Sequence, residues 1–432
     1  MLRCAGKGLV TDDFRKSTQV DELDFFVCHT WDTKRKPKFV ALAMFSNSAR
    51  AALAVLILHL ILMTLDVFAL LPTVTRNRNA FVEISPWCSF CACPLYWFVV
   101  FTNYDFPWNR GPTVFLDKLC VNQEDANHRS GGIDAIPTII NKSKGMVVVL
   151  TTSGLTKVWT MFEISAFLLQ NGPKHLYVQP ALLSQVCFFG SWTVYCCVVI
   201  FIGITSIKSV VVQSLLLLVL LVGTLLPSAL FARYLFKWGI EINDLHRQAE
   251  HFNFDTALCT VEADRVMLKN LVSELFHNDS VKDADSQDSP RNTTKTNSNT
   301  GRTSPACRNQ KDLQVMVADA RYNALGKTGL PLHLLLALNI SLISAECDSI
   351  SGDVRRVLLG ILPAHRLGQT LLAAMADISF CFAAESVFFY LCIHVAYRQS
   401  QRLPAWLQVM KIGISSSCWE FSSCHSELHF RL

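Results

Sequence analysis

The sequence predicts an α/β fold in which a parallel sheet is interrupted by transmembrane helices and followed by a mostly helical membrane C-terminal part. The first observation is composition, because 51% of the 432 residues are apolar and only 17% are charged, whereas soluble domains carry about 25% charged residues. The second is a set of apolar runs of the length that crosses a hydrocarbon core about 30 Å thick. The third is the alternation of short β-branched runs with helical patterns, which is typical of parallel sheets.

Composition also excludes several classes of protein. A wholly disordered chain needs low hydrophobicity and high charge, and this chain has the opposite balance. Its formal net charge is only +5, and its Lys and Arg residues are dispersed, so no nucleic-acid partner is expected. Several of the sixteen cysteines lie inside apolar runs, where a thiol acts as a small hydrophobe. We therefore expect free thiols, not a disulfide framework.

Four short segments have the pattern of strands in a parallel sheet. Residues 146–150, MVVVL, form a continuous β-branched run of the kind that strands buried on both faces show. We expect residues 25–28, 114–116 and 146–150 to lie in one parallel sheet. Residues 176–178 are expected to form the fourth strand.

Four apolar segments are expected to cross the lipid bilayer, and two later ones are weaker candidates. Basic residues precede the first segment and follow the fourth, and such residues favour the cytosolic side. This predicts a multi-pass integral membrane protein with a cytosolic N-terminus. The four segments are residues 51–71, 87–102, 181–206 and 209–232, and the weaker two are residues 330–345 and 369–397.

The same patterns divide the chain into seven parts. Residues 1–48 contain the first strand, residues 49–103 form a transmembrane hairpin inserted in the α/β unit, and residues 104–180 are its main block. A second transmembrane hairpin, residues 181–236, and a helical cytosolic segment, residues 237–277, follow. Residues 278–311 are rich in Ser, Thr, Asn and Asp and predict a disordered linker. The C-terminal region, residues 312–432, contains the possible further membrane helices.

Residues that can carry chemistry gather near the predicted strands. In open α/β sheets ligands bind at the carboxyl ends of the strands, and most of these residues follow a strand or lie on the next helix. No spacing typical of a metal site stands out, since the cysteines at 88, 91 and 93 lie in an apolar run that favours membrane packing or acylation over zinc. The candidate residues are His29, Trp31, Asp117, Lys118, Gln123, Ser143, Trp159 and Glu163.

These segments resemble the conserved blocks of a known family. The runs FFVCHTW, FLDKLCVNQ, INKSKGMVVVLT and VWTMFE look like the blocks of TIR-like domains, and the order of blocks and apolar helices is similar to polytopic TIR-like proteins of protists such as dinoflagellates. The family usually has serine where Cys28 stands and cysteine where Thr160 stands. The resemblance implies a TIR-like, flavodoxin-like sheet, in which residues 25–28 pair with residues 114–116 on one side and with residues 146–150 on the other.

The resemblance also implies roles for particular residues. In TIR domains that cleave NAD, a glutamate on the helix after the third strand contacts the nicotinamide ribose, and Glu163 occupies that place. A carboxylate there stabilises the positive charge that develops as nicotinamide leaves. NAD is then a substrate, and no cofactor or metal is expected. The loop at residues 117–125 would border the pocket and mediate self-association.

Simpler roles stand beside these. Trp159 fits a core aromatic that packs its helix on the sheet, and Glu163 fits a solvated helix charge. Asp117 and Lys118 fit residues that organise the loop by hydrogen bonding, and His29 fits a hydrogen-bonded residue with no acid or base role.

The sequence is consistent with three functions. The favoured one is a signalling or interaction module that self-associates at the membrane. The first alternative is a NAD glycohydrolase that uses Glu163, and the second is a channel or transporter with intramembrane charges at Asp66, Asp377 and Glu385.

Overall fold

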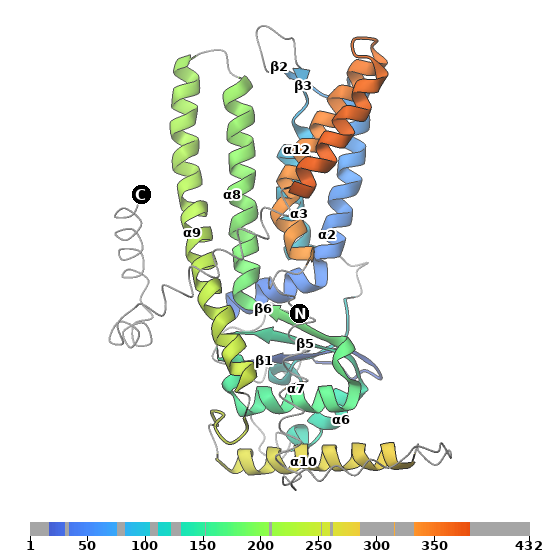
Figure 1. Ribbon diagram of the computed structural model, residues 1–432, viewed down its shortest axis with the longest axis vertical. Coiled ribbons are helices and arrows are strands. Elements are labelled where there is room, and N and C mark those ends of the chain that lie inside the picture. Colours follow the sequence, from blue (N-terminus) through green and yellow to red (C-terminus); the bar gives the residue numbers. More distant parts are fainter. Residues whose placement is uncertain are drawn as a thin grey trace, which may run out of the picture.

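The protein consists of an α/β unit beneath a bundle of long helices (Figure 1). A parallel sheet and its covering helices form the α/β unit, and most of the long helices rise from it in one direction. The computed structural model describes residues 17–30, 34–75, 83–103, 111–121, 131–151, 153–206, 210–251, 253–259, 262–285, 315 and 332–380.

The sheet contains four parallel strands in the order β4-β1-β5-β6. The predicted placement of the first strand between the second and third is therefore confirmed. Phe26 of β1 lies opposite Phe115 of β4, and their rings stack with centroids 5.2 Å apart. The strands are β1 (Leu23–His29), β4 (Val114–Phe115), β5 (Ser143–Leu150) and β6 (Leu176–Pro180).

Helices cover both faces of the sheet, which explains the continuous apolar runs in its strands. Successive side chains of a strand point to opposite faces. Phe26 and Met146 accordingly pack in the core that includes residues of α6 (Ile136–Lys142) and α7 (Val158–Asn171). Their neighbours Val27 and Val147 instead pack against Ala41 and Leu42 of α2.

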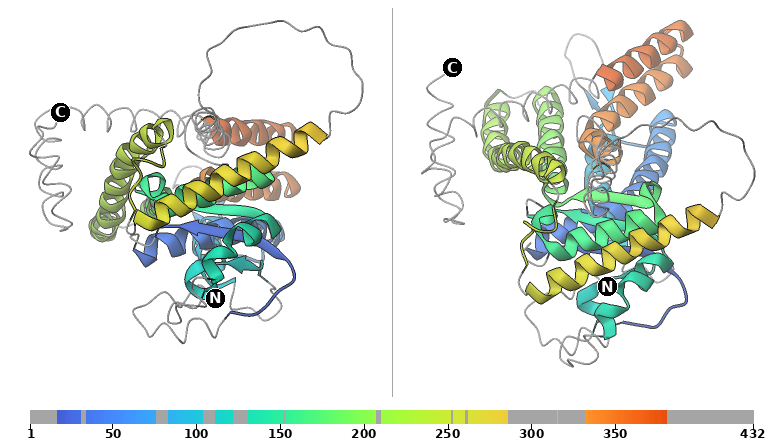
Figure 2. Two further views of the ribbon diagram at one scale, coloured as in Figure 1. Left: turned by 90° about the horizontal axis from the view of Figure 1, so that it is seen from below. Right: turned by 60° about the horizontal axis from the view of Figure 1, so that its bottom comes forward.

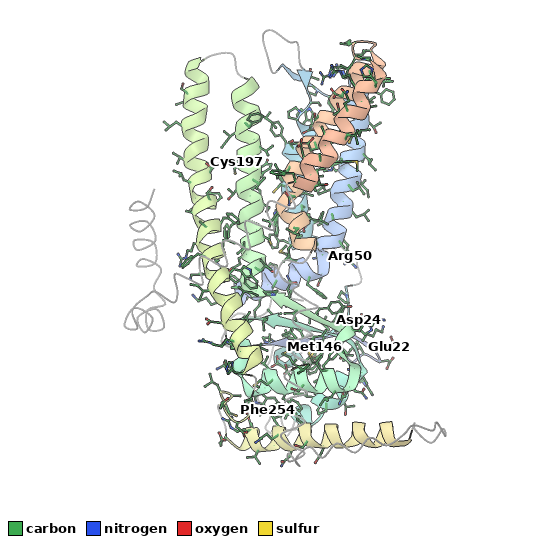
Figure 3. All side chains as sticks on the ribbon, viewed as in Figure 1. Glu22, Asp24, Arg50, Met146, Cys197 and Phe254 are labelled. Atoms are coloured by element: carbon green, nitrogen blue, oxygen red, sulfur yellow. The ribbon has the colours of Figure 1, made fainter. Side chains whose placement is uncertain are left out.

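Helix α2 (Arg35–Val67) corrects the predicted boundary of the first membrane helix. The sequence placed its start at residue 51 and assigned the preceding residues to the N-terminal segment. The structure begins the helix at Arg35, and its first half covers the sheet before the helix joins the bundle (Figure 1). Arg50 lies at the lower end of the part that runs along the bundle (Figure 3). Pro37 is tolerated because it lies in the first turn, where its missing N–H has no helical partner.

The bundle contains α2, α3, α8, α9 and α12. Within the described residues, three helices are long and apolar enough to cross a membrane: Arg35–Val67, Ala181–Gly203 and Leu334–Leu358. The third was only a weak candidate from sequence. Trp87–Thr102 is apolar but shorter. The other bundle helices have the bounds α3 (Trp87–Thr102), α8 (Ala181–Ser206), α9 (Val210–Glu250) and α12 (Leu332–Leu358).

Several smaller features differ from the sequence-based expectation. A short antiparallel pair, β2 (Val74–Thr75) and β3 (Glu83–Ile84), lies between α2 and α3 and was not anticipated. The expected helix at 369–397 is present over 364–380 and otherwise lies outside the described residues. Short turns of helix occur at α4 (Asp117–Cys120), η3 (Gly154–Thr156) and η4 (Pro173–His175).

The last helix of the α/β unit, α10 (Glu262–Asp285), packs across α7 (Figure 2). It extends into the segment predicted as a disordered linker, because residues 278–285 are helical. From residue 286 to 311 the predicted linker lies outside the described residues.

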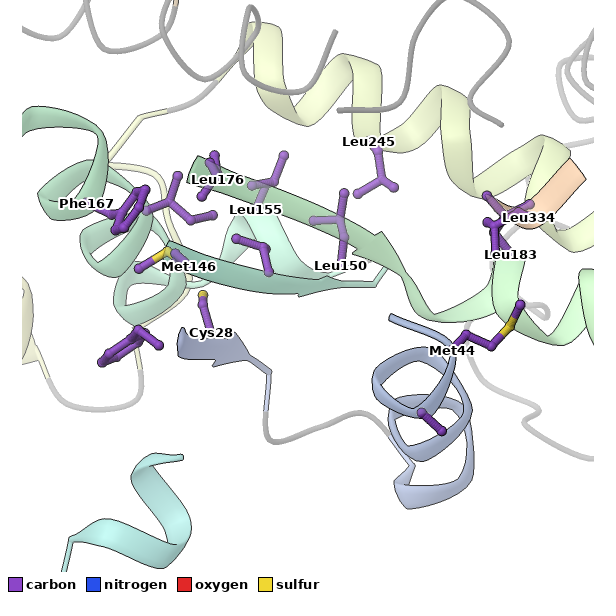
Figure 4. Close-up of a cluster of buried hydrophobic side chains, with 14 of the residues drawn as sticks. Cys28, Met44, Met146, Leu150, Leu155, Phe167, Leu176, Leu183, Leu245 and Leu334 are labelled. Atoms are coloured by element: carbon purple, nitrogen blue, oxygen red, sulfur yellow. The ribbon is translucent and has the colours of Figure 1, made fainter. Parts of the chain in front are cut away.

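One hydrophobic core runs without a break from the sheet into the bundle. Figure 4 shows Cys28 and Met146 of the sheet in the same cluster as Met44, Leu183 and Leu334 of the helices above. The ten cysteines of the described chain are all free thiols, as their apolar surroundings predicted. The α/β unit and the bundle are thus packed as one body.

Candidate functional site

Glu163 is a buried acid between α7 and the sheet. Helix α7 is covered by the sheet, by α6 and by α10, so nearly its whole surface is buried and only 8% of Glu163 is exposed. The reading of Glu163 as a solvated helix charge is therefore wrong. Buried carboxyl groups need partners, and those of Glu163 come from the ends of two strands.

Cys28 and Asp117 are the two neighbouring groups that shift the pKa of Glu163. Cys28 is the next-to-last residue of β1, and Asp117 follows β4 at the start of α4. Burial, followed by the charge of Asp117, raises the pKa of Glu163 to about 8, although a hydrogen bond with Cys28 acts in the opposite direction. Burial and then the charge of Glu163 raise the pKa of the Cys28 thiol well above its usual range. At neutral pH the Glu163 carboxyl is therefore mostly protonated.

His29 extends this cluster toward the surface. Its Nδ1 lies 3.8 Å from Oδ1 of Asp117, and the two side chains are 9% and 22% exposed. Because β1 and β4 are parallel neighbours, their carboxyl ends bring Cys28, His29 and Asp117 together at one edge of the sheet. We call Cys28, His29, Asp117 and Glu163 the strand-end cluster.

The ends of β1 and β5 are joined by a buried polar contact that sequence reasoning missed. The hydroxyls of Thr30 and Thr151 lie 3.0 Å apart, and Nζ of Lys38 on α2 donates to the Thr30 carbonyl at 2.5 Å. Both threonines directly follow strands that were expected to be neighbours in the sheet. Their positions could therefore have predicted this contact. Lys38 had been read only as part of a basic membrane flank.

Two predicted site residues lie away from the cluster. Ser143 begins β5 opposite Leu23, at the amino end of the sheet, and its hydroxyl donates to the Ile139 carbonyl at 2.8 Å. Trp159 is half-buried. It packs against the hydrophobic core that contains residues of the sheet and of α7, and its Nε1 also donates to Oδ2 of Asp264 on α10 at 3.2 Å.

Three further candidates cannot be placed in the cluster. Trp31 and Gln123 lie outside the described residues. Lys118 is in α4, but its side chain lies outside what the structure describes. Within the described part of the chain, no group of three or more His, Cys, Asp and Glu side chains is arranged to hold a metal ion.

A second buried carboxyl, Asp348 of α12, lies within the helical bundle. Its two oxygens accept hydrogen bonds from the backbone N–H groups of Cys88 and Ser89 at 2.9 Å, and from the Ser89 hydroxyl at 2.6 Å. These N–H groups belong to the first turn of α3, whose own N-cap residue, Pro86, makes no side-chain cap. Asp348 therefore supplies the cap of α3 from another helix.

The three acidic residues that suggested a channel or transporter do not share one environment. Asp66 is buried in the last turn of α2, where Oδ2 accepts a hydrogen bond from Ser351 at 2.7 Å and Oδ1 lies 3.8 Å from the guanidinium of Arg355. Asp377 is exposed, and Glu385 lies outside the described residues. The partners of Asp66 make it a contact between α2 and α12.

Comparisons of the chain with models of known families, with curated proteins and with solved structures gave no match. The strand-end cluster must therefore be interpreted from its own chemistry. A protonated Glu163 can donate a hydrogen bond but cannot stabilise positive charge, whereas above pH 8 its carboxylate can.

Proposed function

We propose that this chain is a multi-pass membrane protein that carries a cytosolic TIR-like module and signals through self-association of that module. The observation that carries the proposal is the convergence of the four resembling blocks on one parallel sheet in the order β4-β1-β5-β6. The blocks contribute β1, β4 with α4, β5 and α7. A TIR-like, flavodoxin-like sheet requires this order of its first four strands.

The connection between sheet and bundle gives the proposed module a route to the membrane. Strand β6 ends at Pro180 and α8 begins at Ala181, so no linker separates them. Helix α2 packs on β5 and β6 and then continues into the bundle. Association of two modules would therefore act directly on the membrane helices.

The test is the oligomeric state of the full chain in lipid nanodiscs and in detergent, measured by mass photometry and cross-linking. We expect concentration-dependent self-association that Lys118→Glu, in α4 directly after β4, weakens by about tenfold or more, since like charges across an interface are costly. Lys174→Glu is the matched control, because Lys174 is exposed at the opposite edge of the sheet. A chain that stays monomeric at every concentration contradicts the proposal.

The cytosolic placement has its own test. The sequons at Asn278 and Asn292 would face the cytosol and remain unmodified. A mobility shift that a glycosidase removes from protein made in eukaryotic cells would reverse the proposed orientation.

A NAD glycohydrolase is the second candidate, because the strand-end cluster provides an acid with a raised pKa at the ligand-binding edge of the sheet. Protonation of Glu163 at neutral pH weighs against it, so any cleavage should increase as pH rises through 8. NAD turnover by clustered protein, compared at pH 7 and pH 9, tests this. Glu163→Gln should lower turnover by about a hundredfold, and absence of turnover at both pH values eliminates the enzyme.

A further inference from the structure

A cavity of about 240 Å³ lies beside α7, away from the strand-end cluster. Its walls come from η3 and the start of α7, from the last turn of α9, and from the loop residues 251 and 253–257. Glu163 is not among its lining residues. The position follows the carboxyl end of β5, where ligands bind in open α/β sheets.

Backbone pairing fixes the two sides of this cavity to each other. The Leu258 N–H donates to the Thr156 carbonyl at 2.6 Å, and the Val158 N–H donates to the Leu258 carbonyl at 3.1 Å. The loop is held from its other side by Nη1 of Arg265, which donates to the carbonyls of Phe254 and Asp255 at 2.6 and 2.9 Å. Figure 3 shows Phe254 beside the lower end of α9. The cavity walls are therefore positioned before any ligand arrives.

The ionisable side chains that line the cavity can carry only positive charge. Arg247 and His251 are the two lining residues that can carry positive charge, and none of the nine lining residues is a carboxylate. The Arg247 side chain is 71% exposed, and one of its nitrogens, Nη2, bonds to Asp244 at 3.1 Å. A guanidinium has five N–H donors in a planar fork, so others can bond a ligand. This lining favours an oxyanion over a cation.

The remaining walls limit the size of the ligand. Asn253 and Thr256 add polar side chains, while Met161 forms part of an apolar wall. Pockets for drug-sized molecules have volumes of about 300–1,000 Å³, and this cavity is smaller. It accommodates a phosphate group with little attached to it.

We propose that this cavity binds a phosphate group, either free or as a small phosphate monoester, through Arg247 and His251. Because Arg247 lies in the last turn of α9 and Thr156 precedes α7, the bound group would bridge a helix of the bundle to the helix that carries Glu163. The proposal rests on the cavity and its charge alone, and it stands whether or not the sheet belongs to a TIR-like domain.

The experiment measures phosphate binding to the full chain in nanodiscs, by equilibrium dialysis at constant ionic strength. Inorganic phosphate is the first probe, glycerol phosphate is the second, and glycerol is the neutral control. We expect saturable binding of a phosphate probe and none of glycerol. Tighter binding of glycerol phosphate would identify a monoester as the ligand, and tighter binding of inorganic phosphate would identify the free ion.

Variants locate the binding. Arg247→Gln should weaken phosphate binding by at least about tenfold, the loss expected for a hydrogen bond to a charged group, whereas Lys174→Gln should bind like the unchanged protein. His251→Gln provides a second variant on the same wall if Arg247→Gln fails to fold. Absence of saturable binding, or equal affinity in the cavity variants and the control, overturns the proposal.

Discussion

Glu163 in the α/β unit and Asp348 in the helical bundle are both buried acids on helices, but their partners differ. Asp348 accepts three hydrogen bonds, two from the backbone of α3 and one from Ser89. Glu163 has a hydrogen bond with Cys28 and a second carboxyl, Asp117, close enough to raise its pKa. Burial is common to both, so the difference lies in their partners: Asp348 caps a neighbouring helix, whereas Glu163 faces a second carboxyl.

The largest effect is expected from Asp348→Ala, which tests whether this acid is an anchor. The change leaves the first N–H groups of α3 without their cap and should lower the free energy of unfolding by about 3 kcal/mol or more. Thermal and denaturant unfolding in detergent measure this loss. Glu346→Ala on the same helix is the control, and equal stability of the two variants would show that the cap contributes nothing.

A pH-dependent effect, smaller for each pH unit than the loss from Asp348→Ala, is expected from Glu163→Gln. The raised pKa means that the folded protein keeps a proton that the unfolded chain has released, so stability should fall as pH rises from about 4.5 to about 8 and then level off. Each pH unit within that interval should cost about 1.4 kcal/mol. Glu163→Gln should remove this slope, and the same slope in both proteins would contradict the assignment.

The smallest effect is expected from Asp117→Asn. Removing this charge should lower the pKa of Glu163, although burial keeps it above its usual range. The stability curve of the variant should therefore level off at a lower pH than that of the unchanged protein. Asp134→Asn, at an exposed position, is the control. The carboxyl absorption of Glu163, followed by infrared difference spectroscopy against Glu163→Gln, reports the same midpoint independently.

Sequence reasoning succeeded where the signal was local. The helices at Trp87–Thr102 and Ala181–Ser206 have the predicted bounds, because an apolar run flanked by polar residues defines its own length. The β-branched runs separated by helical patterns predicted a parallel sheet, and the expected order of its strands was that of the flavodoxin-like sheet implied by the resemblance.

It failed where a residue's surroundings come from distant segments. The start of α2 was predicted at residue 51, but the helix begins at Arg35 and its first half covers the sheet. The burial of α7 depends in part on α10, about a hundred residues later in the chain. Asp348 was not singled out, because its partners are backbone groups of Cys88 and Ser89, some 260 residues earlier. The hydrophobic pattern of a single segment carries no information about its contacts with distant segments of the chain.

The position of β1 in the sheet has a consequence for biosynthesis. This strand is made first, yet its two neighbours, β4 and β5, both follow α2 and α3 in the chain. The ribosome must therefore complete two apolar helices before β1 can acquire a partner on either side. Until then Phe26 lacks Phe115 of β4, on which its ring stacks in the finished protein, and exposed apolar segments of this kind are the ones that aggregate or engage chaperones.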